Sequence, residues 1–413
     1  MITTFPMRTT LPEKKRFQDK LIRSSKAESE SQLMTITLTS TFILTASLLL
    51  VPTLALRAND ALPPFSWDRV PVYAHVGKTS GDFTPEQLDF LAKHFDFITI
   101  EKHQASHKHG STEAGFAVAA REIKKRNPKA KVLFYWNASL DTSSRRGVYK
   151  AMKTFPADGF LKDSEGNPVL RRKTVPNYDL TRQDVRDWWS DAAAKAVREY
   201  GADGIFADAM GDPPRANLKT LDEQTVSDLR AARLAMMKET RRKIGPDKLI
   251  VYNGLMRENR EKLLRVTDGA MDEHFGHFAN GSSKEQIAEA ILAAQEAGRD
   301  GKIVLIKGWP GFSYREPEMM KKPHDELARL AKQRITFPLA CFLVAAQPHS
   351  YFCYTWGYRE KLGTFQWYPE FDKPLGPPRG DTTRTGWTYQ RDFAHASVFV
   401  DLENRTARID WKR

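Results

Sequence analysis

Two short apolar runs in this chain end in carboxylates. Gly-Ala-Asp-Gly-Ile-Phe-Ala-Asp leads to Asp208, and Gly-Ala-Met leads to Asp272 and Glu273. Both runs have the composition of buried β-strands, so a carboxylate at the end marks a place where the strand opens onto a site. Cleavage of a glycosidic bond needs two carboxyl groups, one as acid and one as nucleophile or base. Asp208 and Glu273 are therefore the candidate catalytic pair, and Asp272 is the alternative to Glu273.

Other apolar runs end in polar and aromatic residues. Aromatic rings stack on the CH faces of sugars, while amides, carboxylates and ammonium groups hydrogen-bond sugar hydroxyls. We therefore expect a carbohydrate substrate and a binding surface built from these strand ends. The candidate substrate-binding residues are Glu101, His103, Tyr135, Trp136, Asn137, Tyr252, Asn253, Lys307, Trp309, Tyr354 and Trp356.

The elements that would position these residues alternate regularly. Strands are predicted at 70–76, 95–103, 131–139, 201–210, 249–255, 269–275, 302–310 and 350–357, with helices between them. The strands are continuous apolar runs, as parallel strands buried on both faces require. The expected fold class is therefore α/β, a (β/α)8 TIM barrel, whose strand ends form the active site. An open doubly wound sheet is the alternative, but no glycine-rich phosphate turn follows the first strand.

The predicted barrel covers 59–362, and the remainder, 363–413, has a different composition. A proline- and aromatic-rich loop is followed by two β-prone runs around Glu403-Asn404. This pattern predicts a β-hairpin, a small C-terminal β element that caps the barrel. One long helix is expected at 324–346, immediately before the eighth strand.

The N-terminal residues predict export. An apolar stretch at 42–55 is too short for a comfortable membrane span, and small residues that suit signal cleavage, such as Ala55, lie at its end. We expect an upstream polar segment at 1–33, a signal peptide at 34–58 and a secreted or periplasmic protein with no stable membrane span after cleavage. An uncleaved N-terminal membrane anchor is the alternative.

Composition narrows the list of partners. Of the net charge of +13, residues 1–57 contribute +4 and the rest comes from basic residues scattered over predicted helices; no Walker loop, zinc-finger spacing or RNA-binding motif is present. We expect no nucleic-acid partner and no cofactor; the oligomeric state is not indicated. The two cysteines, Cys341 and Cys353, lie among apolar neighbours, which favours buried free thiols over a disulfide.

Three motifs carry a family resemblance over about 70–400. They are NYDLTRQDVRDWW at 177–189, GADGIFAD at 201–208 and DEHF at 272–275. Together they resemble hypothetical glycoside-hydrolase barrels and polygalactosaminidase-like enzymes and, more remotely, the clan D α-galactosidase layout. The resemblance implies that Asp208 is the nucleophile and Glu273 the acid/base. The clan D acid is an aspartate, so Glu273 departs from that pattern.

Two other functions compete with glycoside hydrolysis. A non-catalytic carbohydrate-binding barrel would use the same aromatic residues without an acid pair. A metal-dependent hydrolase would use the histidine-rich stretches 103–110 and 272–277, but no HExxH motif is present and solvated loop histidines explain them better. We therefore predict no metal site.

Overall fold

The computed structural model describes residues 61–142, 148–212, 221–275 and 282–412. The predicted polar segment 1–33 and signal peptide 34–58 lie outside these residues. Within the described chain, no helix is long and apolar enough to cross a membrane.

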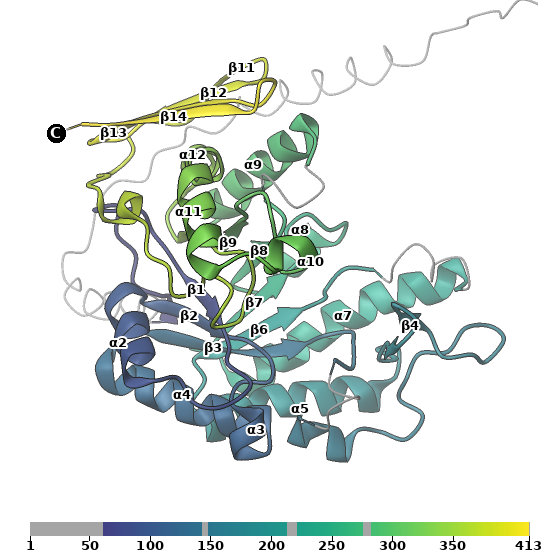
Figure 1. Ribbon diagram of the computed structural model, residues 1–413. Coiled ribbons are helices and arrows are strands. Elements are labelled where there is room, and N and C mark those ends of the chain that lie inside the picture. Colours follow the sequence, from purple (N-terminus) through teal and green to yellow (C-terminus); the bar gives the residue numbers. More distant parts are fainter. Residues whose placement is uncertain (1–60, 143–147, 213–220, 276–281, 413) are drawn as a thin grey trace, which may run out of the picture. The chain divides into compact units, whose positions relative to one another are not determined.

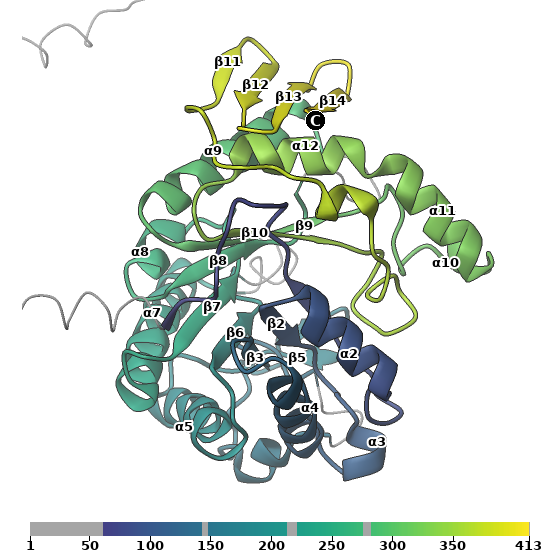
Figure 2. The same cartoon turned by 90° about the vertical axis from the view of Figure 1, so that its left-hand side faces the viewer.

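Eight parallel strands form one sheet in the order β1-β2-β3-β6-β7-β8-β9-β10 (Figures 1 and 2). The chain brings the two ends of this sheet together: the Tyr73 amide donates to the Phe352 carbonyl at 3.0 Å, and the Phe352 amide donates to the Pro71 carbonyl at 2.9 Å. The predicted (β/α)8 barrel is confirmed. The strands are β1 (Ala74–Val76), β2 (Phe97–Ile100), β3 (Lys131–Asn137), β6 (Gly204–Asp208), β7 (Leu249–Asn253), β8 (Gly269–Asp272), β9 (Ile303–Gly308) and β10 (Ser350–Tyr354).

Helices surround the strands (Figure 2). Their starts carry local signals: Thr84 and Ser283 each form a capping box, with Gln87 and Gln286 respectively. The helix predicted at 324–346 is instead two helices, because Pro338 has no N–H to bond the fourth residue before it. The helices are α2 (Pro85–His94), α3 (Ser106–His109), α4 (Thr112–Arg126), α5 (Gln183–Glu199), α7 (Glu223–Ile244), α8 (Arg260–Leu264), α9 (Lys284–Arg299), α10 (Pro317–Met320), α11 (His324–Arg334) and α12 (Thr336–Ala345), with 3-10 turns at Lys150–Thr154 and Pro369–Asp372.

Apolar side chains form two layers, one on each side of the strands. The inner layer fills the barrel and includes Tyr73, Phe206, Val251 and Met271. The outer layer lies between strands and helices. Successive side chains of a strand point to opposite faces, so each strand contributes alternate residues to the two layers. Cys341 and Cys353 are buried free thiols, as predicted.

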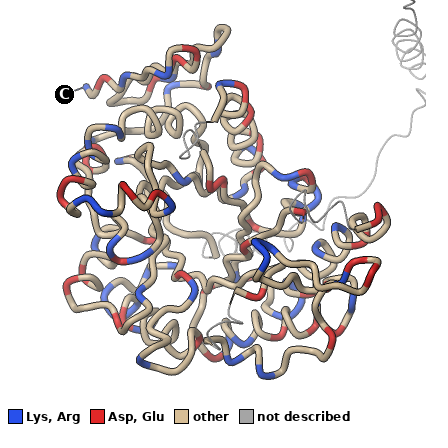
Figure 3. Tube along the Cα trace, turned by 45° about the vertical axis from the view of Figure 1, so that its right-hand side comes forward, with Lys and Arg blue, Asp and Glu red and all other residues tan. Residues whose placement is uncertain are grey.

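The C-terminal element is larger than the predicted hairpin. That hairpin is β13 (Ala396–Asp401) with β14 (Thr406–Trp411), and β11 (Thr383–Thr385) and β12 (Thr388–Asp392) extend it to a four-stranded antiparallel sheet. The sheet lies against α12 (Figure 1), where Arg391 donates to the Leu343 carbonyl at 3.0 Å. A second small sheet pairs β4 (Leu170–Arg171) with β5 (Val175–Pro176). Basic and acidic residues are interspersed along the described chain (Figure 3).

Candidate active site

Strand alternation selects which strand-end side chains enter the barrel mouth. In β3, for example, Leu133 and Tyr135 belong to the inner layer, so Asn137 follows on the same face. The same count on the other strands places one polar ring at the carboxyl ends. This ring consists of His75, Glu101, Tyr135, Asn137, Asp208, Asn253 and Glu273; Lys307 lies on the same face of its strand but is 0% exposed.

Asn253 connects the two candidate catalytic carboxylates. Its Nδ2 donates to Asp208 Oδ1 at 2.9 Å and to Glu273 Oε2 at 2.9 Å. The two oxygens are therefore no farther apart than twice this distance. Because the two N–H bonds of an amide diverge by roughly 120°, linear hydrogen bonds would place the oxygens about 5 Å apart. Asp208 and Glu273 thus face the same small space at the mouth.

Asp208 accepts hydrogen bonds from two further groups. The Tyr135 hydroxyl donates to Oδ2, and Asn137 Nδ2 donates to the same oxygen at 3.2 Å. Together with Asn253, three donors on the two neighbouring strands hold this carboxylate. Such an arrangement fixes the carboxylate in one orientation.

A buried ion cluster lies next to Tyr135. His75 Nε2 is 2.8 Å from Glu101 Oε2, Lys102 donates to the other Glu101 oxygen, and both His75 and Glu101 are 3% exposed. Burial raises the pKa of Glu101, but the charges of Lys102 and His75 outweigh it and hold the pKa far below its usual range. Burial lowers the pKa of Lys102, while Glu101 and Asp208 raise it above its usual value. Lys102 therefore stays charged, and its Nζ is 3.3 Å from the Tyr135 hydroxyl.

Glu273 has a different set of partners. The Tyr358 hydroxyl donates to Oε1 at 3.0 Å, and Trp309 Nε1 donates to the Glu273 backbone carbonyl at 2.6 Å. Burial raises the pKa of Glu273, but the charge of His274 and the hydrogen bonds from Asn253 and Tyr358 outweigh it, so the pKa is lowered. Burial also lowers the pKa of His274, so its charge contributes only in acid, and the two donors act at neutral pH. A carboxyl group that holds its proton as a resident general acid has a raised pKa, so the lowered pKa of Glu273 is opposite to what this role requires.

Asp272 is on the other face of β8 from Met271 and Glu273. It accepts a hydrogen bond from the His274 amide at 3.0 Å. Burial raises the pKa of Asp272 to about 6, and the charge of Glu273 acts in the same direction. Asp272 is therefore not the inward carboxylate of this pair of neighbours.

Four aromatic residues predicted to bind substrate instead lie in the outer layer. Trp136 donates to the Trp189 carbonyl at 3.3 Å, Tyr252 to the Arg260 carbonyl at 3.3 Å and Tyr354 to the Ala331 carbonyl at 2.9 Å. Trp356 is 0% exposed and packs beside the ring of Phe312. All four side chains lie on the outer face of the strands, so their rings pack against helices and loops and offer no surface to a sugar.

Three more predicted residues are near the site without facing it. His103 lies beyond the end of β2, with a φ of 65°, and its ring is 6.4 Å from that of Tyr149. Trp309 is 2% exposed and donates to the Glu273 backbone carbonyl, and Lys307 is 0% exposed. Conversely, the mouth includes Lys102 and Tyr358, which the sequence analysis missed. Lys102 adjoins Glu101, but Tyr358 lies in the loop after β10 and has no local signal.

The described residues contain no group of three or more His, Cys, Asp or Glu side chains arranged to hold a metal ion. His277, in the second histidine-rich stretch, lies outside them. The first stretch forms α3, where His109 Nε2 is 2.7 Å from Asp82.

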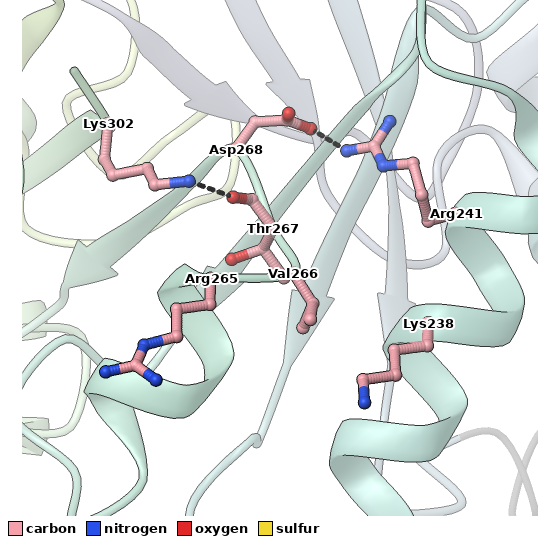
Figure 4. A pocket seen from close by; sticks show the side chains of 7 residues that line it. All are labelled: Lys238, Arg241, Arg265, Val266, Thr267, Asp268 and Lys302. Carbon is pink, nitrogen blue, oxygen red and sulfur yellow. Dashed lines mark hydrogen bonds and ion pairs between the residues drawn. The ribbon is translucent and has the colours of Figure 1, made fainter. Parts of the chain in front are cut away.

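A pocket of about 360 Å³ lies at the opposite, amino-terminal end of the strands (Figure 4). Lys238, Arg241, Arg265 and Lys302 contribute to its lining. Arg241 pairs with Asp268, and Lys302 donates to the Thr267 carbonyl at 3.0 Å. Figure 4 shows Arg265 pointing away from both of them, so the four cations do not converge on one point.

Comparison with known proteins gives the class to which this fold and site belong. The model of hypothetical glycosyl hydrolase family 15 matches residues 124–397. The chain belongs to this family. No curated protein matches it.

Solved structures with a similar fold include several glycoside hydrolases. The glycoside hydrolase domain of PelA from Pseudomonas aeruginosa is 14% identical, with a TM-score of 0.46, and the match covers 73% of this chain and 96% of that one. The maltogenic α-amylase AmyB from Thermotoga neapolitana is 12% identical, with a TM-score of 0.47, covering 80% and 84%. The α-amylase from Geobacillus thermoleovorans is 12% identical, with a TM-score of 0.45, covering 81% and 87%.

Proposed function

We propose that this protein is a retaining glycoside hydrolase that cleaves O-glycosidic bonds of a poly- or oligosaccharide with Asp208 and Glu273. The observation that carries the proposal is the Asn253 amide, which donates to both carboxylates at 2.9 Å. Retaining enzymes hold their carboxyl groups about 5–5.5 Å apart, whereas inverting enzymes need roughly 6.5–9.5 Å to admit a water. A shared amide nitrogen agrees with the shorter separation.

Asp208 is the proposed nucleophile. Its three donors, Tyr135, Asn137 and Asn253, fix the carboxylate and leave it facing the space that Glu273 borders. Glu273 is the proposed acid and base. It would protonate the leaving oxygen in the first step and activate a water in the second.

The lowered pKa of Glu273 means that the proton must be acquired in the substrate complex. A sugar in the mouth displaces water and deepens the burial of Glu273, and burial favours the protonated carboxyl. A hydroxyl that competes for the Asn253 or Tyr358 donor would act in the same direction. We therefore expect the acid to be formed on binding.

Substrate hydroxyls would be held by the remaining polar groups of the mouth. Lys102, with 28% of its side chain exposed, is a donor beside Tyr135, and Asn137 lies next to it on β3. The mouth thus offers amide and ammonium groups to a sugar and few exposed aromatic faces. The sequence instead predicts a binding surface rich in aromatic residues.

The lowered pKa of Glu273 also favours a second candidate, a non-catalytic carbohydrate-binding barrel. The deciding experiment is a screen of glycans and aryl glycosides with proton NMR of the first product anomer, using Asp208→Asn as the control. Hydrolysis with retained configuration, abolished in the control, supports the proposal. Inverted product refutes the retaining mechanism, and binding without turnover by the unaltered protein favours the second candidate.

We also propose that the protein is exported, with 34–58 as its signal peptide. It would then act on its sugar polymer outside the inner membrane. Amino-terminal sequencing of the protein recovered from the periplasm or medium tests this. A new terminus between residues 56 and 59 supports export with cleavage. An intact amino terminus in the membrane fraction favours the anchored alternative.

A further inference from the structure

Lys307 is a buried lysine inside the barrel. It is 0% exposed, and its Nζ donates to the Gly308 carbonyl at 3.1 Å and to the Thr355 carbonyl. The same nitrogen is 3.9 Å from the ring centroid of Trp309 and 5.6 Å from that of Tyr358. An ammonium beside two aromatic rings attracts both of them electrostatically, most strongly where water is excluded.

The two rings that Lys307 contacts are the ones that hold Glu273. Trp309 donates from its indole to the Glu273 backbone carbonyl at 2.6 Å, and Tyr358 donates from its hydroxyl to Oε1 at 3.0 Å. The rings are also in edge contact with each other, with centroids 6.0 Å apart and an interplanar angle of 79°. One cation thus packs against two of the groups that donate to Glu273, one to its backbone carbonyl and one to its carboxylate, and Asn253 is a third donor.

We propose that Lys307 is a positioning residue that orients Glu273 through Trp309 and Tyr358 and does not itself bind substrate. Its complete burial separates it from the mouth, contrary to the substrate-binding role expected from the sequence. The positioning itself is independent of the reaction, but its catalytic consequence rests on the proposed function.

The role of Lys307 can be measured through the pH dependence of activity, because the groups around it titrate at other pH values. Burial lowers the pKa of Lys307 to about 8, while its electrostatic interactions with Cys353 and Glu273 act in the opposite direction. Burial raises the pKa of Cys353 on β10 and of Tyr358, so both stay protonated in weak alkali. The pKa values of Glu273 and His274 are lowered, so both have lost their protons by then. Among these groups, Lys307 is the one that titrates in weakly alkaline solution.

The test compares Lys307→Met with Lys302→Met in the full chain. Lys302 also donates to a carbonyl, at 3.0 Å from Thr267, but lies just before β9 at the other end of the barrel. Two measurements are made: kcat and KM against pH with an aryl glycoside, and the carboxyl carbon resonance of Glu273 against pH by NMR. The second needs no turnover.

Lys307→Met is expected to lower kcat about thirtyfold, which is the rate equivalent of the roughly 2 kcal/mol that one desolvated cation–π contact contributes. KM should change by less than about threefold, because uniform binding is not altered. The alkaline decline in activity near the Lys307 pKa should vanish, and the Glu273 resonance should lose its second, alkaline step. Lys302→Met should leave all four quantities unchanged.

Lys307→Met with wild-type kcat and a wild-type Glu273 titration would overturn the proposal. If this variant does not fold, the unaltered protein decides: absence of an alkaline step in its Glu273 resonance overturns the proposal as well. An altered Glu273 titration in a protein that hydrolyses no glycoside would refute the proposed function while supporting the positioning by Lys307.

Discussion

Replacing Asn253 by alanine removes a side chain that donates to both candidate catalytic carboxylates. Two hydrogen bonds of 2.9 Å to carboxylate oxygens are lost, and bonds to charged groups contribute about 1.5–3 kcal/mol each. If about 3 kcal/mol of this total is expressed in the transition state, kcat/KM falls by about two orders of magnitude. The pKa of Glu273 should rise, because Asn253 donates to its ionised form.

The assay measures kcat/KM against pH, where the limb on the alkaline side of the optimum reports loss of the general acid's proton in the free enzyme. In Asn253→Ala this limb should move to higher pH. Tyr135→Phe is the matched control, because it removes a donor to Asp208 and none to Glu273. It should lower the rate without moving the limb. A limb that stays in place in Asn253→Ala, or that moves equally in both variants, would refute the bridging role of Asn253.

Three further predictions address the pair, the buried aromatics and the buried lysine. Asp208→Asn should reduce turnover by several orders of magnitude with unchanged circular dichroism. Glu273→Gln should slow the hydrolysis of substrates with poor leaving groups far more than that of activated aryl glycosides. Equal losses on both kinds of substrate would contradict the acid role of Glu273. Trp356→Ala should lower the free energy of unfolding by about 3–5 kcal/mol in denaturant titrations, because its ring is fully buried, and a folded variant with only a raised KM would show that the ring binds sugar after all. The free energy of unfolding should rise with pH between about 8 and the ordinary lysine value of 10.5, because the unfolded chain binds the Lys307 proton more tightly over that window; in Lys307→Met, urea titrations should show that increase removed.

The residues at the strand ends show how much of the site the sequence pattern predicts. A carboxylate after a buried run is unusual, which predicts Asp208 and Glu273 as site residues, and both lie at the mouth. Nearness to strand ends also predicts Trp136 and Tyr252 as site residues, yet both lie in the outer layer. The difference is the period of two along a strand: Tyr135 and Asn137 face inward, so Trp136 between them faces outward. Counting from the inner residues of each strand would have separated the two groups.

The order of the eight barrel strands and of the helices between them follows from the sequence alone, because local properties determine it. Alternating apolar and amphipathic runs, capping residues such as Thr84 and stops such as Gly201 act over a few neighbouring residues. The carboxylates after the fourth and sixth strands are equally local. These features predicted the barrel, its order of strands and helices, and the candidate pair.

The tertiary structure decided which groups act on that pair. Asn253 bridges Asp208 and Glu273 only because three strands meet at one rim, and Tyr358 reaches Glu273 from a loop 85 residues further along the chain. The direction of the Glu273 pKa depends on the balance between burial and these donors, and Lys307 supports it through two rings from different segments. Hydrogen bonds and charge interactions act over a few ångströms in space, whereas the residues that make them are far apart in sequence, so only the closed barrel brings them within range.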